Sequence, residues 1–155
     1  MILMHILLAM HVLVAEDNED HARIIARAIR SAGPEVATKI TVTVVSDGSE
    51  VLAYLRGEGR YDGRTLPDLV LLDLKMPGVD GLEVVRIVRA DPRLQLIPLI
   101  MLTSSARDED VTDAYASGVN EYVTKTGRAD EFRAKVQAIP RYWSHVVQRP
   151  PRPGR

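Results

Sequence analysis

The sequence predicts an α/β fold in which a parallel β-sheet is covered by helices on both faces. Short apolar runs of strand length alternate with amphipathic stretches of helix length along the chain. One run, Leu69 to Leu72, is continuously apolar, as is typical of a central parallel strand buried on both faces. Because strand–helix units in series are joined by right-handed crossovers, the strands should form one parallel sheet in a three-layer domain.

The first two strand–helix units are predicted from apolar runs and helix caps. The first strand is expected at His11 to Ala15, followed by a helix from Glu19 to Ala32 with Asn18 as its N-cap. The β-branched segment Lys39 to Val45 is expected to be the second strand. Asp47 should then cap the second helix.

Three further units follow a polar, turn-rich loop from Gly57 to Pro67. Their predicted strands are Leu69–Leu72, Pro98–Leu102 and Val119–Thr124. The predicted helices are Gly81–Ala90, Asp108–Ser117 and a last one that starts near Ala129. Pro140 lies within the apolar stripe of this last helix and is expected to kink or restart it.

Composition and charge fit one soluble domain. The 155 residues suffice for a single hydrophobic core, and the apolar fraction of 46% and charged fraction of 26% are ordinary. The net charge of -1 gives no electrostatic support for a nucleic-acid partner. Because the chain has no cysteine, disulfides and thiolate sites are excluded.

Both ends of the chain differ in composition from its centre. The N-terminal run MILMHILLAMHVLV is apolar, but it is shorter than the roughly 20 residues of a membrane span and has no basic region before it. We therefore expect residues 1–10 to be an extension, with Met10 as an alternative start, and the protein to be cytoplasmic with no membrane partner. Residues 11–148 should form the domain, and the proline-rich residues 149–155 a disordered tail.

Polar side chains follow four of the predicted strands. Because the carboxyl ends of parallel strands meet at one edge of the sheet, these side chains should converge there. They are Glu16 and Asp17, then Asp73, then Thr103 and Ser104, and finally Lys125.

The chemistry of such a cluster favours a metal-assisted phosphoryl transfer. Two carboxylates about 4 Å apart repel by roughly 4 kcal/mol at an effective dielectric of about 20, so three of them require a cation. Oxygen ligands favour Mg²⁺, and Asp73 then becomes a nucleophile for a phosphoryl group. The ammonium group of Lys125 and the hydroxyl of Thr103 can bind the phosphoryl oxygens.

Taken singly, each residue has a simpler role. The acidic pair could cap the first helix, Asp73 could occupy a turn, and Lys125 could be a solvated strand end. The two hydroxyl residues could cap a later helix. Their joint placement favours a shared site.

The chain resembles the receiver domains of two-component response regulators. The motifs VLVAEDN, LVLLDLKMPGVDG, LIMLTSSA and YVTK carry the resemblance, which extends from Val12 to Ile139. It implies a flavodoxin-like (βα)5 sandwich with strand order 2-1-3-4-5, as the chemotaxis member of this family exemplifies.

The resemblance also implies a role for each residue of the cluster. Asp73 would accept a phosphoryl group from a histidine kinase. The Mg²⁺ ligands would be Asp73, Asp17, Glu16 (directly or through water) and the backbone carbonyl of Lys75. The phosphoryl-binding residues would be Thr103, Ser104 and Lys125.

Thr103 and Tyr122 would form the switch pair of such a receiver. On phosphorylation Thr103 would turn toward the phosphoryl group and Tyr122 would rotate into the vacated space. The face formed by the fourth helix, fifth strand and fifth helix would then change shape. Ordinary core packing is the simpler role for Tyr122.

The chain departs from the family pattern at one position, and other segments indicate a subgroup within the family. Most receivers follow the active-site lysine with proline, whereas this chain has Thr126. The segments YLRGEGRY, LTSS, YVTKT and RYWSHVV are similar to the single-domain regulators that serve phytochrome-type photoreceptor kinases.

The end of the last helix has two open interpretations. An apolar stripe with helical spacing continues to Trp143 and Val146, beyond the part that should cover the sheet. These two side chains could form a homodimer contact or cover the domain's own edge. The four histidines lack the spacing of a metal site, and His21, near the pocket on the first helix, is expected to face solvent.

Four other functions compete with a phosphorylated single-domain switch. A phosphorelay intermediate and a degenerate receiver acting as a binding module share its fold, and the intact Asp73, Thr103 and Lys125 argue against the second. An aspartate-nucleophile phosphatase is disfavoured because Lys75 occupies the position of its usual second Asp. A nucleotide-binding domain is disfavoured because no glycine-rich loop follows the first strand. We therefore expect a signalling protein that catalyses only its own phosphorylation and dephosphorylation.

Overall fold

The structure is a computed structural model that describes residues 9–33, 39–125 and 127–151. Its parallel sheet has the order β2-β1-β3-β4-β5, which confirms the expected topology. The strands are β1 (Met10–Ala15), β2 (Ile40–Val45), β3 (Leu69–Leu72), β4 (Leu99–Thr103) and β5 (Glu121–Thr124).

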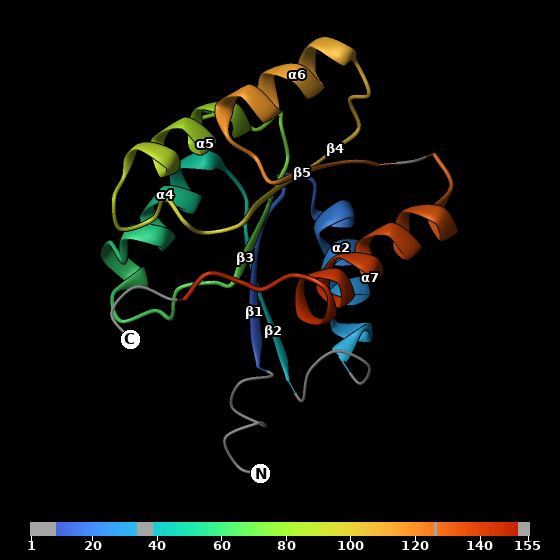
Figure 1. The fold of residues 1–155 in the computed structure, drawn as a ribbon, viewed down its shortest axis with the longest axis horizontal. Coiled ribbons are helices and arrows are strands. Elements are labelled where there is room, and N and C mark those ends of the chain that lie inside the picture. The colour runs from blue at the N-terminus through green and yellow to red at the C-terminus, as the bar shows by residue number, and fades with distance from the viewer. Residues whose placement is uncertain (1–8, 34–38, 126, 152–155) are drawn as a thin grey trace.

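Helices cover both faces of this sheet, as Figure 1 shows. On one face α2 and α7 lie side by side, and on the other α5 lies between α4 and α6. The helices are α2 (Glu19–Ser31), α4 (Gly48–Arg56), α5 (Gly81–Ala90), α6 (Asp108–Ser117) and α7 (Ala129–His145). The observed architecture is therefore the predicted three-layer sandwich.

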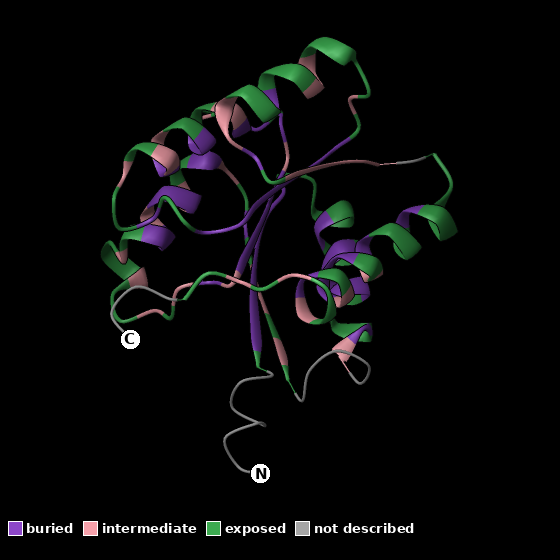
Figure 2. Ribbon diagram, in the orientation of Figure 1, coloured by how far each residue is buried: buried purple, intermediate pink, exposed green. Residues whose placement is uncertain are grey.

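The hydrophobic core consists of two apolar layers, one on each side of the sheet (Figure 2). Strand β3 shows how they are built, because successive side chains point to opposite faces. Val70 and Leu72 pack under α4 and α5, whereas Leu69 and Leu71 pack under α2 and α7. All four are fully buried, which explains the continuously apolar run.

Short polar caps fix where the helices begin. The Oδ1 atom of Asn18 accepts a hydrogen bond from the His21 N–H at 3.0 Å, and Asp47 caps α4 in the same way. Both caps were predicted. Asp80 caps α5, since its Oδ1 atom accepts a hydrogen bond from the Glu83 N–H at 2.9 Å. This cap was not predicted.

The strand limits differ slightly from expectation. Strand β1 begins one residue earlier, at Met10, because Met10 pairs with Ile40 of β2. Strand β4 is displaced by one residue and includes Thr103, and β5 begins later, at Glu121. Residues 1–8 of the expected N-terminal extension lie outside the described residues.

The loop before β3 is more ordered than its polar sequence suggests. It contains a short 3-10 helix, η1 (Gly59–Tyr61). The Arg64 side chain donates from Nε to the Tyr54 carbonyl at 2.7 Å and from Nη2 to the Leu55 carbonyl. A cationic group on the last carbonyls of α4 satisfies acceptors that the helix leaves unpaired.

Helix α7 runs as one helix through Pro140, so the expected restart does not occur. Trp143 is 6% exposed and packs with the apolar layer under α2 and α7. Its Nε1–H donates to Glu121 Oε2 at 3.2 Å. Trp143 therefore covers the domain's own edge, the second of its two expected roles, whereas Val146 is 70% exposed.

The chain beyond α7 crosses to the opposite helical layer (Figure 1). An Nη1 atom of Arg149 lies 3.5 Å from Asp68 Oδ1. Pro150 and Pro151 line a small cavity together with Leu96 and other residues near β3 and β4. Residues 149–151 thus contact the domain, in contrast to the expected disordered tail, and residues 152–155 lie outside the described residues. Among the described helices, none has both the length and the apolarity that crossing a membrane requires.

The burial of Trp143 gives a testable stability difference. We expect Trp143→Ala to lower the free energy of unfolding by about 3 to 5 kcal/mol, because it opens a cavity in the core. Val146→Ala changes an exposed side chain three residues further along, so it should change the free energy of unfolding by less than about 0.5 kcal/mol. Urea denaturation of both variants measures this, and similar losses in the two would contradict the assignment of Trp143 to the core.

Candidate functional site

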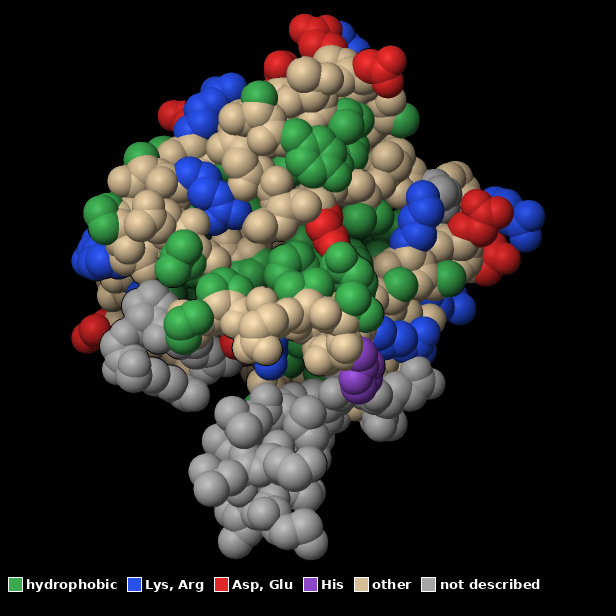
Figure 3. Space-filling model, in the orientation of Figure 1, with side chains coloured by type: hydrophobic (Ala, Val, Ile, Leu, Met, Phe, Trp, Pro, Cys, Tyr) green, Lys and Arg blue, Asp and Glu red, His purple; other side chains and the backbone are tan. Residues whose placement is uncertain are grey.

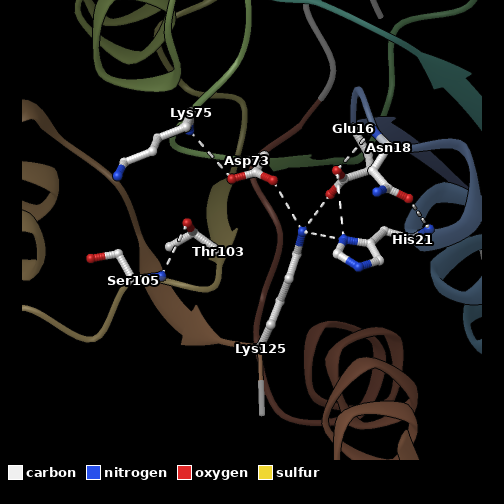
Figure 4. A network of polar contacts seen from close by, with 8 residues as sticks. All are labelled: Glu16, Asn18, His21, Asp73, Lys75, Thr103, Ser105 and Lys125. Carbon is white, nitrogen blue, oxygen red and sulfur yellow. Dashed lines mark hydrogen bonds and ion pairs between the residues drawn. The ribbon is translucent and has the colours of Figure 1, made fainter. Parts of the chain in front are cut away.

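The predicted cluster forms at the carboxyl edge of the sheet (Figure 4). Lys125 Nζ lies 2.5 Å from Glu16 Oε2 and 3.0 Å from Asp73 Oδ2. The three side chains follow different strands, β1, β3 and β5. They are 2% to 12% exposed, so this is a largely buried arrangement of two carboxylates around one ammonium group.

Backbone hydrogen bonds continue the sheet ladder past the strand ends and fix these side chains. The Glu16 N–H donates to the Val45 carbonyl at 3.0 Å, and the Asp73 N–H to the Ala15 carbonyl at 3.1 Å. The Lys125 N–H donates to the Thr103 carbonyl at 2.7 Å. The site residues are therefore held by the same bonds that hold the sheet.

Three carboxylates could share one metal ion. Glu16, Asp17 and Asp73 each offer an oxygen atom, and these atoms all lie within 4.8 Å of one another. Glu16 is buried, whereas Asp17 is exposed, so the cluster opens toward solvent on one side. A mixed set of carboxylate oxygens with an open side fits a hard divalent cation that keeps part of its water shell.

The electrostatics of the site leave an excess of negative charge. Burial, together with the nearby charge of Asp73, raises the pKa of Glu16 above its usual range despite the hydrogen bond from Lys125. Burial alone would lower the pKa of Lys125, but its hydrogen bonds to Glu16 and Asp73 outweigh burial and raise it. Lys125 is thus held as an ammonium ion, and it faces more carboxylates than it can neutralise.

Two glycines bring the loop after Asp73 close to its neighbours. A Cβ atom on Gly81 would lie 2.4 Å from the Asp73 carbonyl oxygen, and one on Gly48 would lie 2.0 Å from the Val79 carbonyl oxygen. Any side chain there would displace the loop. The same loop carries the Lys75 N–H, which donates to Asp73 Oδ1 at 3.3 Å.

The hydroxyl side of the site is organised around Ser105. Thr103 is 2% exposed, and its Oγ1 accepts from the Ser105 N–H at 3.4 Å. The half-buried Tyr122 donates from its hydroxyl to the Ser105 carbonyl at 2.8 Å. The Ser105 hydroxyl donates to the Asp110 carboxylate on α6. The expected pair Thr103 and Tyr122 is therefore connected through one intervening residue, while Ser104 is exposed.

His21 is exposed, as expected, but it also contacts the site, which was not predicted. Its side chain is 46% exposed, but the ring points into the site, with Nδ1 at 3.3 Å from Lys125 Nζ and 3.9 Å from Glu16 Oε1. The signal that could have revealed it is its place in the first turn of α2, three residues after the cap Asn18. Asp110 was also missed, and it lines an open cleft with Asp17 and Lys75. Thr126, where most receivers have proline, lies outside the described residues.

A family comparison decides the classification. The model of the response regulator receiver domain matches residues 12–137. The chain belongs to this family. The resemblance seen in the sequence motifs is therefore confirmed over most of the chain.

Individual relatives cover nearly the whole chain. It is 39% identical over 133 residues to the probable methanogenesis regulatory protein FilR2 of Methanothrix harundinacea, covering 85% of this chain and 82% of FilR2. It is 30% identical over 139 residues to the response regulator Rcp1 of Synechocystis sp., covering 90% of this chain and 92% of Rcp1.

Solved structures of response regulators are also similar to this chain. The phosphorylated cyanobacterial phytochrome response regulator RcpA superposes with a TM-score of 0.85 at 35% identity, covering 92% of this chain and 99% of RcpA. The Mn²⁺-bound form of Rcp1 superposes with a TM-score of 0.81 at 30% identity, with 92% and 99% covered. The protein is thus a receiver similar to Rcp1 and RcpA in sequence and fold.

The raised pKa of Glu16 predicts a pH-dependent effect of Glu16→Gln. A carboxyl whose pKa is raised in the folded state contributes stability below its unfolded pKa, and this contribution is lost as pH rises through the folded pKa. Without metal ions, Glu16→Gln should therefore be more stable than the native chain at pH 7. The difference should shrink as the pH falls toward 4.5, the ordinary pKa of glutamate.

Thermal unfolding in a chelating buffer across this pH range measures the effect. Glu19→Gln, the same change at an exposed residue in the first turn of α2, is the matched control and should follow the native curve. A native chain that is more stable than Glu16→Gln at pH 7 would contradict the prediction.

Proposed function

We propose that this protein is a signalling switch that accepts a phosphoryl group on Asp73 from a histidine kinase. The observation that carries the proposal is the convergence of the Asp73 carboxylate with an acidic pair and the Lys125 ammonium group at the carboxyl edge of the sheet. Membership of the receiver family supports it.

The transfer exchanges one bond to phosphorus for another, and solvent water supplies the proton that the leaving group needs. A carboxylate oxygen of Asp73 forms a bond to phosphorus as the phosphorus–nitrogen bond of the donor phosphohistidine breaks, and the departing imidazole takes up a proton. Lys125 stabilises the charge on the phosphoryl oxygens from one side. On the other side, Thr103 at the end of β4 and Ser104 directly after it would donate hydrogen bonds to them.

A divalent cation, which we propose to be Mg²⁺, fits the acidic cluster. Glu16, Asp17, Asp73 and the carbonyl of Lys75 would hold it. When bound, it would neutralise part of the negative charge on the carboxylates and on the incoming phosphoryl group. The excess of negative charge around Lys125 and the Mn²⁺-bound form of the related Rcp1 support this assignment.

The output would depend on Thr103 and Tyr122. A Thr103 hydroxyl that turns toward a phosphoryl group gives up its contact with the Ser105 N–H, and Ser105 also accepts from the Tyr122 hydroxyl. The phosphoryl group would thereby shift the balance between two arrangements of the loop before α6 and of the face formed by α6, β5 and α7.

A phytochrome-type kinase is the proposed phosphoryl donor. This part of the proposal rests on the similarity to Rcp1 and to the phytochrome response regulator RcpA. A role as a phosphorelay intermediate uses the same chemistry. The arrangement of Asp73 and Lys125 favours either role over that of a binding module.

A homodimer through the C-terminal helical region is a separate proposal. Apolar side chains gather at the centre of the face shown in Figure 3, where β5 and the C-terminal segment lie in Figure 1. Because Trp143 is buried in its own chain, the contact would have to use exposed side chains such as Tyr142 and Val146, which are 44% and 70% exposed.

The phosphorylation of Asp73 is tested by intact mass. Incubation with acetyl phosphate and Mg²⁺ should add one phosphoryl group to the native chain and none to Asp73→Asn, because the amide lacks the nucleophilic oxygen. Asp20→Asn, the same change at an exposed residue of α2, should be phosphorylated like the native chain. An unmodified native chain, or a modified Asp73→Asn, would rule out Asp73 as the acceptor.

Metal binding is tested by stability. Mg²⁺ at 100 times its dissociation constant should raise the free energy of unfolding of the native chain by about 2.7 kcal/mol, because it binds only the folded state. Asp17→Asn should lose most of this gain, and Asp20→Asn should retain it. An equal gain in Asp17→Asn would exclude Asp17 as a ligand.

A further inference from the structure

The ammonium group of Lys125 has three acceptors within hydrogen-bonding distance. Glu16 Oε2 lies at 2.5 Å, Asp73 Oδ2 at 3.0 Å and His21 Nδ1 at 3.3 Å (Figure 4). An ammonium group carries three N–H donors and no acceptor. Every donor of Lys125 therefore has one partner, and Nδ1 of His21 accepts the third.

Two of these partners belong to the short segment that leads from β1 into α2. Glu16 and His21 flank Asn18, whose side chain accepts from the His21 N–H and whose own N–H donates to Glu16 Oε1 at 3.2 Å. The cap that starts α2 thus ties the Glu16 carboxylate and the backbone of His21 to the same residue, Asn18. Asp73 approaches Lys125 from a different strand, β3.

We propose that His21 is a positioning residue for phosphorylation, which rests on the function proposed above. His21 and Glu16 hold two N–H groups of Lys125, so that the third stays directed at Asp73, where the phosphoryl group arrives. Once an Asp73 oxygen is bonded to phosphorus, that carboxyl no longer carries its negative charge and becomes a weaker acceptor. The third N–H then turns to an adjacent phosphoryl oxygen while the other two remain in place.

A purely structural role for His21 does not fit its surroundings. The side chain is half-exposed and lies outside both described apolar layers of the core. Its backbone N–H, which does serve the helix cap, is present in any residue at this position. Substitution of the imidazole should therefore change the site without destabilising the fold.

The first test compares two substitutions that differ in their ability to accept a hydrogen bond. We expect His21→Leu to reduce the rate constant for phosphorylation by acetyl phosphate about three- to tenfold, as expected for the loss of one hydrogen bond. His21→Gln, which keeps an acceptor, should recover most of the rate. His145→Leu, the same change at an exposed histidine of α7, should leave the rate unchanged.

The second test does not depend on phosphorylation. Acetic anhydride acylates free amines, and mass spectrometry compares the labelling of Lys125 with that of the exposed Lys135. His21→Leu should increase the relative labelling of Lys125 about three- to tenfold, because the amine of Lys125 loses its hydrogen bond to Nδ1 of His21. The affinity for Mg²⁺ and the free energy of unfolding should stay at their native values.

The outcomes separate the two proposals. If the native chain is phosphorylated but His21→Leu matches it in rate, the positioning role is wrong and the switch function stands. If the native chain takes up no phosphoryl group, the function fails, and labelling alone decides whether His21 holds Lys125. Unchanged labelling of Lys125 in His21→Leu overturns the inference in either case.

Discussion

The ion pair of Lys125 with Glu16 and Asp73 is the interaction on which the site depends. It joins the residues that directly follow β5, β1 and β3, where the last hydrogen bonds of the sheet ladder are made. Loss of Lys125 would leave two buried carboxylates without a cation, whereas loss of the Glu16 charge leaves Lys125 paired with Asp73. The cluster is nevertheless not neutral, since burial and Asp73 both act against the charge of Glu16. The excess of negative charge favours the binding of a cation. Without a cation, the same charge lowers the free energy of unfolding.

The sheet holds one side of this site in place, whereas α6 on the other side can change its position more easily. The four residues of β3 are fully buried between two apolar layers, and neighbouring strands hold the backbone on both sides. Within α6, which the structure describes in full, only Ala114 is buried. A helix with so little buried apolar surface can change position at low cost in free energy. The loop that carries Ser105 connects this weakly anchored helix to Thr103.

Local patterns in the sequence predicted the strands and the convergence of the site, whereas the strand order came from the resemblance to receiver domains. Apolar runs define strands, and a polar residue that directly follows a strand must lie at its carboxyl edge, as Asp73 and Lys125 do. The contact of His21 with Lys125 was not predicted because a helical residue next to a site can point toward it or away, and the first turn of a helix has no apolar stripe to decide. The contact of Arg149 with Asp68 was missed because it joins distant segments without any periodic signal.

The position of Trp143 gives the protein a built-in optical reporter. It is the single tryptophan of the chain, so the indole emission arises from one known place. Its Nε1–H is bonded to Glu121, the residue directly before Tyr122 on β5. A carboxylate bonded to the indole affects its emission, and any displacement of β5 changes that contact. The intrinsic fluorescence of the unlabelled protein can therefore follow events on the α6–β5–α7 face in real time.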